Sequence, residues 1–176
     1  MLAAVEIAES WGEHASLWAI RMAIVAMFVT FALQLRGWKE TSPAVRNIWF
    51  FGAISALVHS VGALLAFHGG SHQAALQATA EQTQALMGFS FGAGLYFNYV
   101  FVLIWLIDAI VRMVSPRAYS GWGLAYRGFV YGFLGFIAFN GTVVFKSGWI
   151  QAISLTGIAG LLILAGIRWR TARPYV

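Results

Sequence analysis

The sequence predicts an all-α integral membrane protein, a bundle of five transmembrane helices in a single domain over residues 1–176. Three observations lead to this fold class. First, 60% of the residues are hydrophobic and only 10% are charged, far from the composition of a soluble domain. Second, five apolar stretches each approach the roughly 20 residues that a helix needs to cross a bilayer. Third, most Lys and Arg residues are concentrated in every second gap between the apolar stretches.

The expected spans are residues 16–35, 47–67, 89–111, 126–145 and 149–167. The second span follows Thr41-Ser42-Pro43, where a hydroxyl can cap the helix and Pro can occupy its first position. The connections are short, so neighbouring spans are expected to be antiparallel. Tryptophans at the expected boundaries fit an interfacial aromatic belt.

Nine of the eleven Lys and Arg residues lie in alternate gaps between the apolar stretches: Arg36, Lys39, Arg46, Arg112, Arg117, Arg127, Arg168, Arg170 and Arg173. The positive-inside rule therefore predicts an N-terminus outside and a C-terminus in the cytoplasm. These clusters flank apolar spans, so we expect them to meet lipid headgroups of the bilayer and not nucleic acid. The first fourteen residues contain Glu but neither Lys nor Arg, unlike a signal peptide, so we expect the first span to be retained.

The connection between the second and third spans predicts an amphipathic helix on the outer face. Gly69-Gly70 should end the second span, and Ser71 can cap a helix from His72 to Met87. Polar residues recur on one side of that segment and apolar residues on another. We expect it to lie as a lid across the outer ends of the bundle.

His59 is expected inside the second span, where an ionisable side chain is costly and is therefore a candidate functional residue. We take it as a candidate cofactor-binding residue. Small residues around it allow another helix to approach closely. As a neutral imidazole it could hydrogen-bond to a neighbouring helix. It could instead ligate haem iron, the magnesium of a chlorophyll-type pigment, or copper.

Three further histidines, His14, His68 and His72, are expected at similar heights near the outer surface. Imidazole suits zinc and copper, so together they form a candidate metal site. The alternative is that they hydrogen-bond to the lid or to lipid headgroups. The chain has no cysteine, which excludes disulfides and thiolate ligands.

The third span carries a polar stripe that includes Tyr96, Asn98, Asp108 and Arg112. Asp108 and Arg112 are spaced i,i+4, which favours an ion pair near the cytoplasmic boundary. The alternative is a carboxylate in a proton relay or substrate site. Asn98 is expected to bridge two helices.

Glycines spaced by four, Gly88 with Gly92 and Gly128 with Gly132, followed by Gly135, are typical of helix packing surfaces. Signatures of nucleotide binding, serine hydrolysis or zinc proteolysis are missing from the sequence, so we do not expect an enzyme. The spans also lack the interrupted helix pairs of a secondary transporter.

Several segments between Trp49 and Lys146 resemble a family of small bacterial polytopic membrane proteins that has no established activity. The matching segments are Ala66-Phe67-His68, Ser71-His72, residues 79–83, 94–99 and 105–108, and Phe139-Asn140-Gly141-Thr142-Val143-Val144-Phe145. The resemblance covers about half of the chain. It implies a multi-pass protein of the bacterial inner membrane, with the outer histidines and the Tyr96, Asn98 and Asp108 stripe as its distinctive core.

Three functions remain open from the sequence. The first is a non-catalytic accessory subunit of a larger membrane complex, respiratory, photosynthetic or similar, with other membrane subunits as partners. The second is a protein that binds a metal, haem or pigment through its outer-side histidines. The third is a small transporter or channel.

Overall fold

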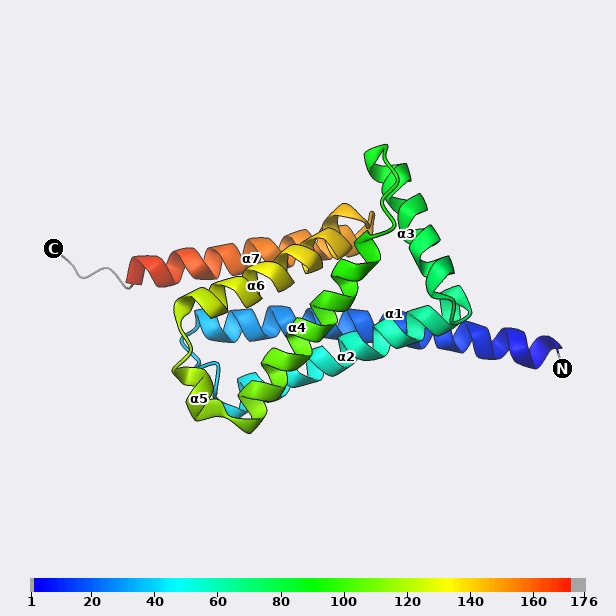
Figure 1. Ribbon diagram of the computed structural model, residues 1–176. Helices are drawn as coiled ribbons and strands as arrows, with labels where there is room; N and C mark the ends of the chain where they lie inside the picture. The colour runs from blue at the N-terminus through cyan, green and yellow to red at the C-terminus, as the bar shows by residue number, and fades with distance from the viewer. Residues whose placement is uncertain (1, 172–176) are drawn as a thin grey trace.

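In the computed structural model the secondary structure is all helical, with short turns and loops between the helices, over the described residues, whose backbone covers 2–171 and whose side chains cover 11–171. The elements in chain order are α1 (Leu2–Leu35), α2 (Pro43–His68), α3 (His72–Met87), α4 (Gly94–Val114), α5 (Pro116–Ser120), α6 (Leu124–Phe139), the π-helical turn η1 (Asn140–Val144) and α7 (Trp149–Thr171). Figure 1 shows α3 across one end of the bundle and α5 at the other.

Five of these helices are long and apolar enough to cross a membrane, as the sequence predicted. The candidate spans are Trp11–Leu35, Pro43–His68, Gly94–Val114, Leu124–Val144 and Trp149–Thr171. Large apolar side chains are exposed on all five, so the surface of the bundle is suited to contact with lipid.

The bundle is built around the pair α1 and α2, which share the most extensive helix contact. Helix α4 packs on α2, and α6 packs on α4. Helix α7 packs against α1 and against η1. Two indole rings at the centre of the core, those of Trp49 on α2 and Trp105 on α4, are fully buried, with ring centroids 5.0 Å apart.

Helix α3 begins and ends where the sequence predicted. Gly69 adopts the left-handed conformation that ends α2, with φ of 55°, and the Ser71 hydroxyl accepts a hydrogen bond from the backbone N–H of Ala74. Gly88, with φ of 79°, ends α3 in the same way. The α3 helix packs against α2 and α4.

Other expected boundaries were wrong. The third span begins at Gly94 and not at Phe89, because Gly88 ends α3 and the apolar residues that follow form a loop. Ser42 does precede the first residue of α2, but its hydroxyl donates to the carbonyl of Lys39 and does not cap the helix. The fourth span, Leu124–Val144, does match the expected 126–145, although its last turn, from Asn140, is π-helical.

The expected glycine packing surfaces are also corrected. Gly88 ends α3, and Gly92 lies in the following loop, so this pair forms no helix surface. Gly128, Gly132 and Gly135 are spaced by four and three residues and so share one face of α6, but a Cβ placed on any of them would have no atom within 4 Å. Inside the described chain, nothing packs closely against this face.

Candidate functional site

The most elaborate polar cluster in the structure surrounds Asp108 on α4, at the end of the bundle that carries α5. The ion pair expected from the i,i+4 spacing is present: the Asp108 Oδ2 atom lies 2.6 Å from Nη2 of Arg112, and both side chains are completely buried. A buried ion pair stabilises a fold only when further hydrogen bonds satisfy its remaining atoms. The neighbours of the two side chains therefore decide what the pair does.

Three further donors meet the Asp108 carboxylate. The indole Nε1 of Trp49 donates to Oδ2 at 2.7 Å. The hydroxyls of Tyr119 and Tyr126 donate to Oδ1 at 3.0 and 3.1 Å. With the Arg112 guanidinium, the two carboxylate oxygens thus have two donors each, which compensates for the loss of water around the charge.

The Arg112 guanidinium lies inside a cage of aromatic rings. Its central carbon is 4.7 Å from the ring centroid of Trp49, 4.8 Å from that of Tyr119 and 5.3 Å from that of Tyr131. Cation–π attraction strengthens when the cation is desolvated, as it is here. Nη2 also donates to the Tyr131 hydroxyl at 3.0 Å, while Nε and Nη1 have no hydrogen-bond partner.

Tyr119 enters this cluster from α5, outside the membrane-spanning helices. Its side chain is fully buried, and this burial raises the pKa of the Tyr119 hydroxyl well above its usual range. The hydroxyl therefore keeps its proton at physiological pH and remains a donor to Asp108. Helix α5 is in this way fastened to α4 by a charged hydrogen bond.

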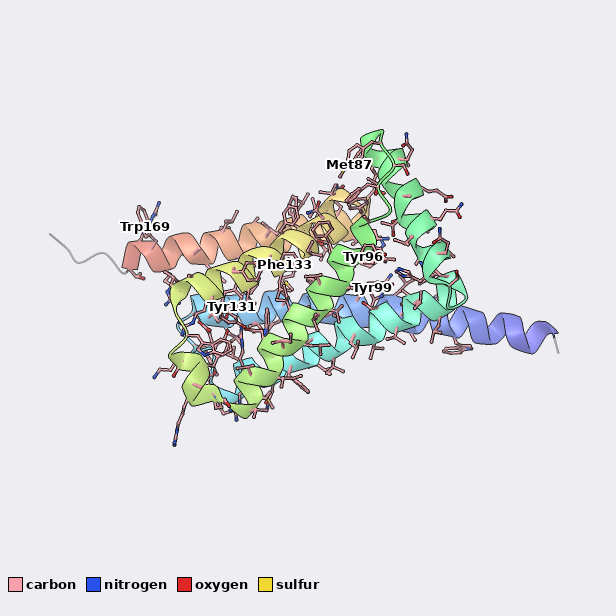
Figure 2. All side chains as sticks on the ribbon, viewed as in Figure 1. Met87, Tyr96, Tyr99, Tyr131, Phe133 and Trp169 are labelled. Carbon is pink, nitrogen blue, oxygen red and sulfur yellow. The ribbon has the colours of Figure 1, made fainter. Side chains whose placement is uncertain are left out.

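The cluster joins five elements. Asp108 and Arg112 come from α4, Trp49 from α2, Tyr119 from α5 and two tyrosines from α6. Helix α1 is joined through Gln34, whose amide Nε2 donates to the Tyr131 hydroxyl at 3.0 Å. Figure 2 shows Tyr131 toward the α5 end of the bundle and Tyr96 and Tyr99 at the opposite, α3 end. Because every contact of this carboxylate is made within the chain, the geometry suits a structural junction better than a substrate site.

The aromatic donors of this cluster were missed by reasoning from the sequence. Trp49 lies 59 positions before Asp108, and no local pattern links the two residues. A signal for the tyrosines existed, because aromatic residues are dense between Arg117 and Tyr131. From hydropathy, that stretch divides into a connection and an apolar span, and neither predicts that its tyrosine hydroxyls lie at Asp108.

His59, the predicted cofactor residue, lies on α2 against Ser16 of α1. Its Nδ1 is 3.0 Å from both the hydroxyl and the backbone carbonyl of Ser16, and the same hydroxyl donates to the His59 carbonyl at 3.2 Å. A carbonyl only accepts, so Nδ1 carries the proton and the lone pair lies on Nε2. The structural hydrogen bond considered from the sequence is therefore present, and Nε2 is the atom left to hold a ligand.

His72, one of the three predicted metal ligands, lies between two tyrosines of α4. Its Nδ1 is 3.2 Å from the Tyr99 hydroxyl, and its Nε2 is 3.4 Å from the Tyr96 hydroxyl. The structure does not bring His14, His68 and His72 into one cluster: across residues 11–171, no three His, Asp or Glu side chains are placed to hold a metal ion. Metal binding by these histidines stays a prediction.

The predicted stripe on α4 divides into two parts. Tyr96 and Asn98 are exposed near the α3 end of the helix, whereas Asp108 and Arg112 are buried near the other end. The stripe is therefore not one continuous polar path along the described helix. Asp108 and Arg112 form the junction described above, whereas Tyr96 and Asn98 lie toward α3.

Comparisons with known proteins give no relative: no family model matches the chain, and neither a curated protein nor a solved structure does.

Proposed function

We propose that this chain is a non-catalytic accessory subunit of a larger complex in the bacterial inner membrane, with its N-terminus outside and its C-terminus in the cytoplasm. In this orientation α3 lies on the outer side and α5 on the cytoplasmic side, beside most of the Lys and Arg residues. The observation that carries the proposal is a contrast within the bundle. The buried charges of the interior are paired with groups of the same chain, whereas the glycine face of α6 is covered by nothing in the described chain.

The interior supports a structural role. The buried Asp108 and Arg112 charges are committed to each other and to aromatic side chains of the same chain. His59 is likewise bound to Ser16. A relay or transport site needs a carboxylate that can exchange partners with a proton, ion or substrate, and each oxygen of Asp108 already accepts from two donors of the same chain.

The small residues of the chain support an external partner. Glycines that lie between helices of this bundle allow a close approach of the neighbouring helix. A Cβ on Gly52 would lie 2.6 Å from Trp105, and one on Gly62 would lie 3.2 Å from the Cβ of Ser16. On α6 the three glycines instead face open space. Small residues allow transmembrane helices to approach closely, so this face suits a helix of another subunit.

The absence of cysteine makes a direct test possible. A single cysteine is introduced by Gly132→Cys on the α6 face, and Val58→Cys provides the control on an exposed face of α2. A short thiol-to-amine cross-linker is applied to native membranes. We expect Gly132→Cys, and not the control, to give one defined adduct with another polypeptide. A self-adduct only, or equal labelling by both variants, would contradict the subunit proposal.

The tautomer of His59 favours a second candidate, a protein that holds one metal-centred cofactor through Nε2. Histidines that bind metals usually donate their other ring N–H to a carbonyl or carboxylate, as Nδ1 of His59 does to Ser16. The two functions are compatible, since a subunit can carry one pigment or haem. An optical spectrum and metal analysis of the purified chain test this candidate: stoichiometric cofactor that is lost in His59→Ala supports it, and none in the wild type rejects it.

A further inference from the structure

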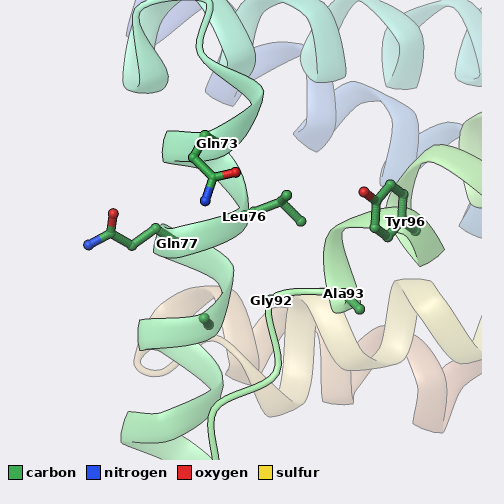
Figure 3. A pocket seen from close by; sticks show the side chains of 7 residues that line it. Gln73, Leu76, Gln77, Gly92, Ala93 and Tyr96 are labelled. Carbon is green, nitrogen blue, oxygen red and sulfur yellow. The ribbon is translucent and has the colours of Figure 1, made fainter.

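A cleft of about 460 Å³ opens between α3 and the beginning of α4 (Figure 3). Its volume lies in the range of small-molecule sites. The lining residues are Gln73, Leu76, Gln77, Ala80, Gly92, Ala93 and Tyr96. Figure 3 shows Leu76 and Tyr96 pointing toward each other across the cleft, while Gln77 points away.

The walls of the cleft are held by backbone contact. A Cβ on Gly92 would lie 2.7 Å from the carbonyl oxygen of Leu76, so the loop before α4 lies directly against α3. The Thr83 hydroxyl, buried on α3, lies 3.4 Å from the carbonyl of Phe91 in the same loop. The close approach of the Gly92 backbone to Leu76 therefore sets the spacing of the two walls at this point.

Tyr96 is positioned by His72. The imidazole Nε2 lies 3.4 Å from the Tyr96 hydroxyl, and the two ring centroids are 5.7 Å apart. The other ring nitrogen of His72 meets Tyr99, which fixes the imidazole from its far side. Half of the Tyr96 side chain nevertheless remains exposed, so its hydroxyl can also bond to a molecule in the cleft.

The chemistry of the lining restricts the ligand. All seven lining residues are uncharged, so nothing among them would offset the charge of a phosphate, a carboxylate or an ammonium group. Gln73 and Tyr96 offer hydrogen-bonding groups, and Leu76, Ala80 and Ala93 offer apolar surface. This combination fits an uncharged head that carries carbonyl or hydroxyl oxygens.

An apolar track leads away from the cleft along α4. Val100, Leu103 and Ile107 follow Tyr96 at spacings of four, three and four residues, which places all four side chains on one helix face. The three apolar members are between 42% and 56% exposed. Because α4 is one of the candidate membrane spans, this track lies where a hydrocarbon chain would run.

We propose that the cleft binds the head of an uncharged amphiphile, with its apolar tail along the α4 track. Membrane quinones and neutral glycerolipids share this chemistry. The site requires only the described contacts of α3 and α4, so it does not depend on the subunit role proposed above.

Equilibrium binding to the purified chain in detergent micelles tests the proposal. The radiolabelled probes are a benzoquinone with a decyl tail and dioctanoylglycerol. We expect saturable one-to-one binding of one probe, which identifies the source of the ligand. Ala93→Phe should fill the cleft and lower the affinity at least tenfold, and Tyr96→Phe should lower it roughly fivefold through loss of one hydrogen bond. Gln82→Ala, exposed on α3 outside the cleft, should bind as the wild type does.

A thermal unfolding midpoint equal to that of the wild type confirms that each variant is folded. If Ala93→Phe fails this requirement, Gln73→Leu takes its place, because it removes a polar group of the lining without adding bulk. Non-saturable partitioning of both probes would overturn the proposal. So would unchanged affinity in the folded cleft variants, or an equal loss in Gln82→Ala.

Discussion

Replacing Asp108 with alanine is the most severe perturbation that the structure identifies. Asp108→Ala removes the counter-charge of Arg112, whose guanidinium is completely buried and lies 2.6 Å from the carboxylate. It also removes the acceptor of Trp49, Tyr119 and Tyr126. The junction that fastens α2, α5 and α6 to α4 would then contain an unpaired charge.

The expected cost is about 3–5 kcal/mol in the free energy of unfolding, the usual result of breaking a buried pair by removing one partner. Asp108→Asn should cost less. Its amide oxygen can accept from Arg112 and Trp49, while its NH₂ group donates to the Tyr119 and Tyr126 hydroxyls, which can accept as well as donate. A double variant, Asp108→Leu with Arg112→Met, should recover part of the loss, because no buried charge remains, although the Trp49, Tyr119 and Tyr126 donors still lack their acceptor.

Denaturant titration in mixed micelles, followed by tryptophan fluorescence, measures these free energies. The predicted order of stability is wild type, then Asp108→Asn, then Asp108→Ala, with the double variant above Asp108→Ala. A loss below about 1 kcal/mol in Asp108→Ala would refute the reasoning, since surface ion pairs contribute that little. A double variant that is less stable than Asp108→Ala would refute it as well.

Three further predictions follow from the packing and the hydrogen bonds. Burial raises the pKa of Tyr119, so its contribution to stability is complete below the pKa of an unfolded tyrosine, near 10, and declines as the pH rises above that value. Tyr119→Phe should therefore flatten the fall of the unfolding free energy between about pH 10 and 12. An unchanged slope would contradict this. Ser16→Ala should cost about 1 kcal/mol, because the hydroxyl contacts with His59 are lost while the Ser16 carbonyl still accepts from Nδ1. A neutral result in the same denaturant titration would argue against the hydroxyl contacts. Gly52→Ala should cost about 1–3 kcal/mol, since its Cβ would lie 2.6 Å from the indole of Trp105. Gly132→Ala should be neutral or slightly stabilising. Equal effects of the two variants would show that the α2–α4 contact is looser than described.

The elements that carry their own signals were predicted well. Gly69-Gly70, Ser71 and Gly88 bracket α3, and the structure places its first and last residues at His72 and Met87 as expected. Five spans followed from hydropathy alone. In these segments, local capping chemistry and apolar length determine the boundaries, and both can be read without tertiary contacts.

Hydropathy misled where apolar residues lie in a loop. Phe89 and Phe91 read as the beginning of a span, but Gly88 and Gly92 give this segment a turn and a close backbone approach to α3. The five-residue helix α5 was not expected, because Pro116 at its start is a weak signal by itself and so short a helix is stable only through contacts such as the burial of Tyr119.

The polar junction could be predicted only in part. The i,i+4 spacing indicated the ion pair of Asp108 with Arg112, because that relation is local to one helix. The donors from α2, α5 and α6 depend on how those helices cross α4, which the sequence does not state. The same holds for His59 and Ser16, which lie 43 positions apart.

The central claim, that this chain is an accessory subunit, is tested most directly by a mild-detergent pull-down of the tagged chain from its native membrane, with every co-purifying polypeptide identified. We predict recovery with a stoichiometric set of other membrane subunits, and loss of that set in Gly132→Leu but not in Val58→Leu. The identity of those subunits would name the process. Recovery of the chain alone, or only as a homo-oligomer, would contradict the claim.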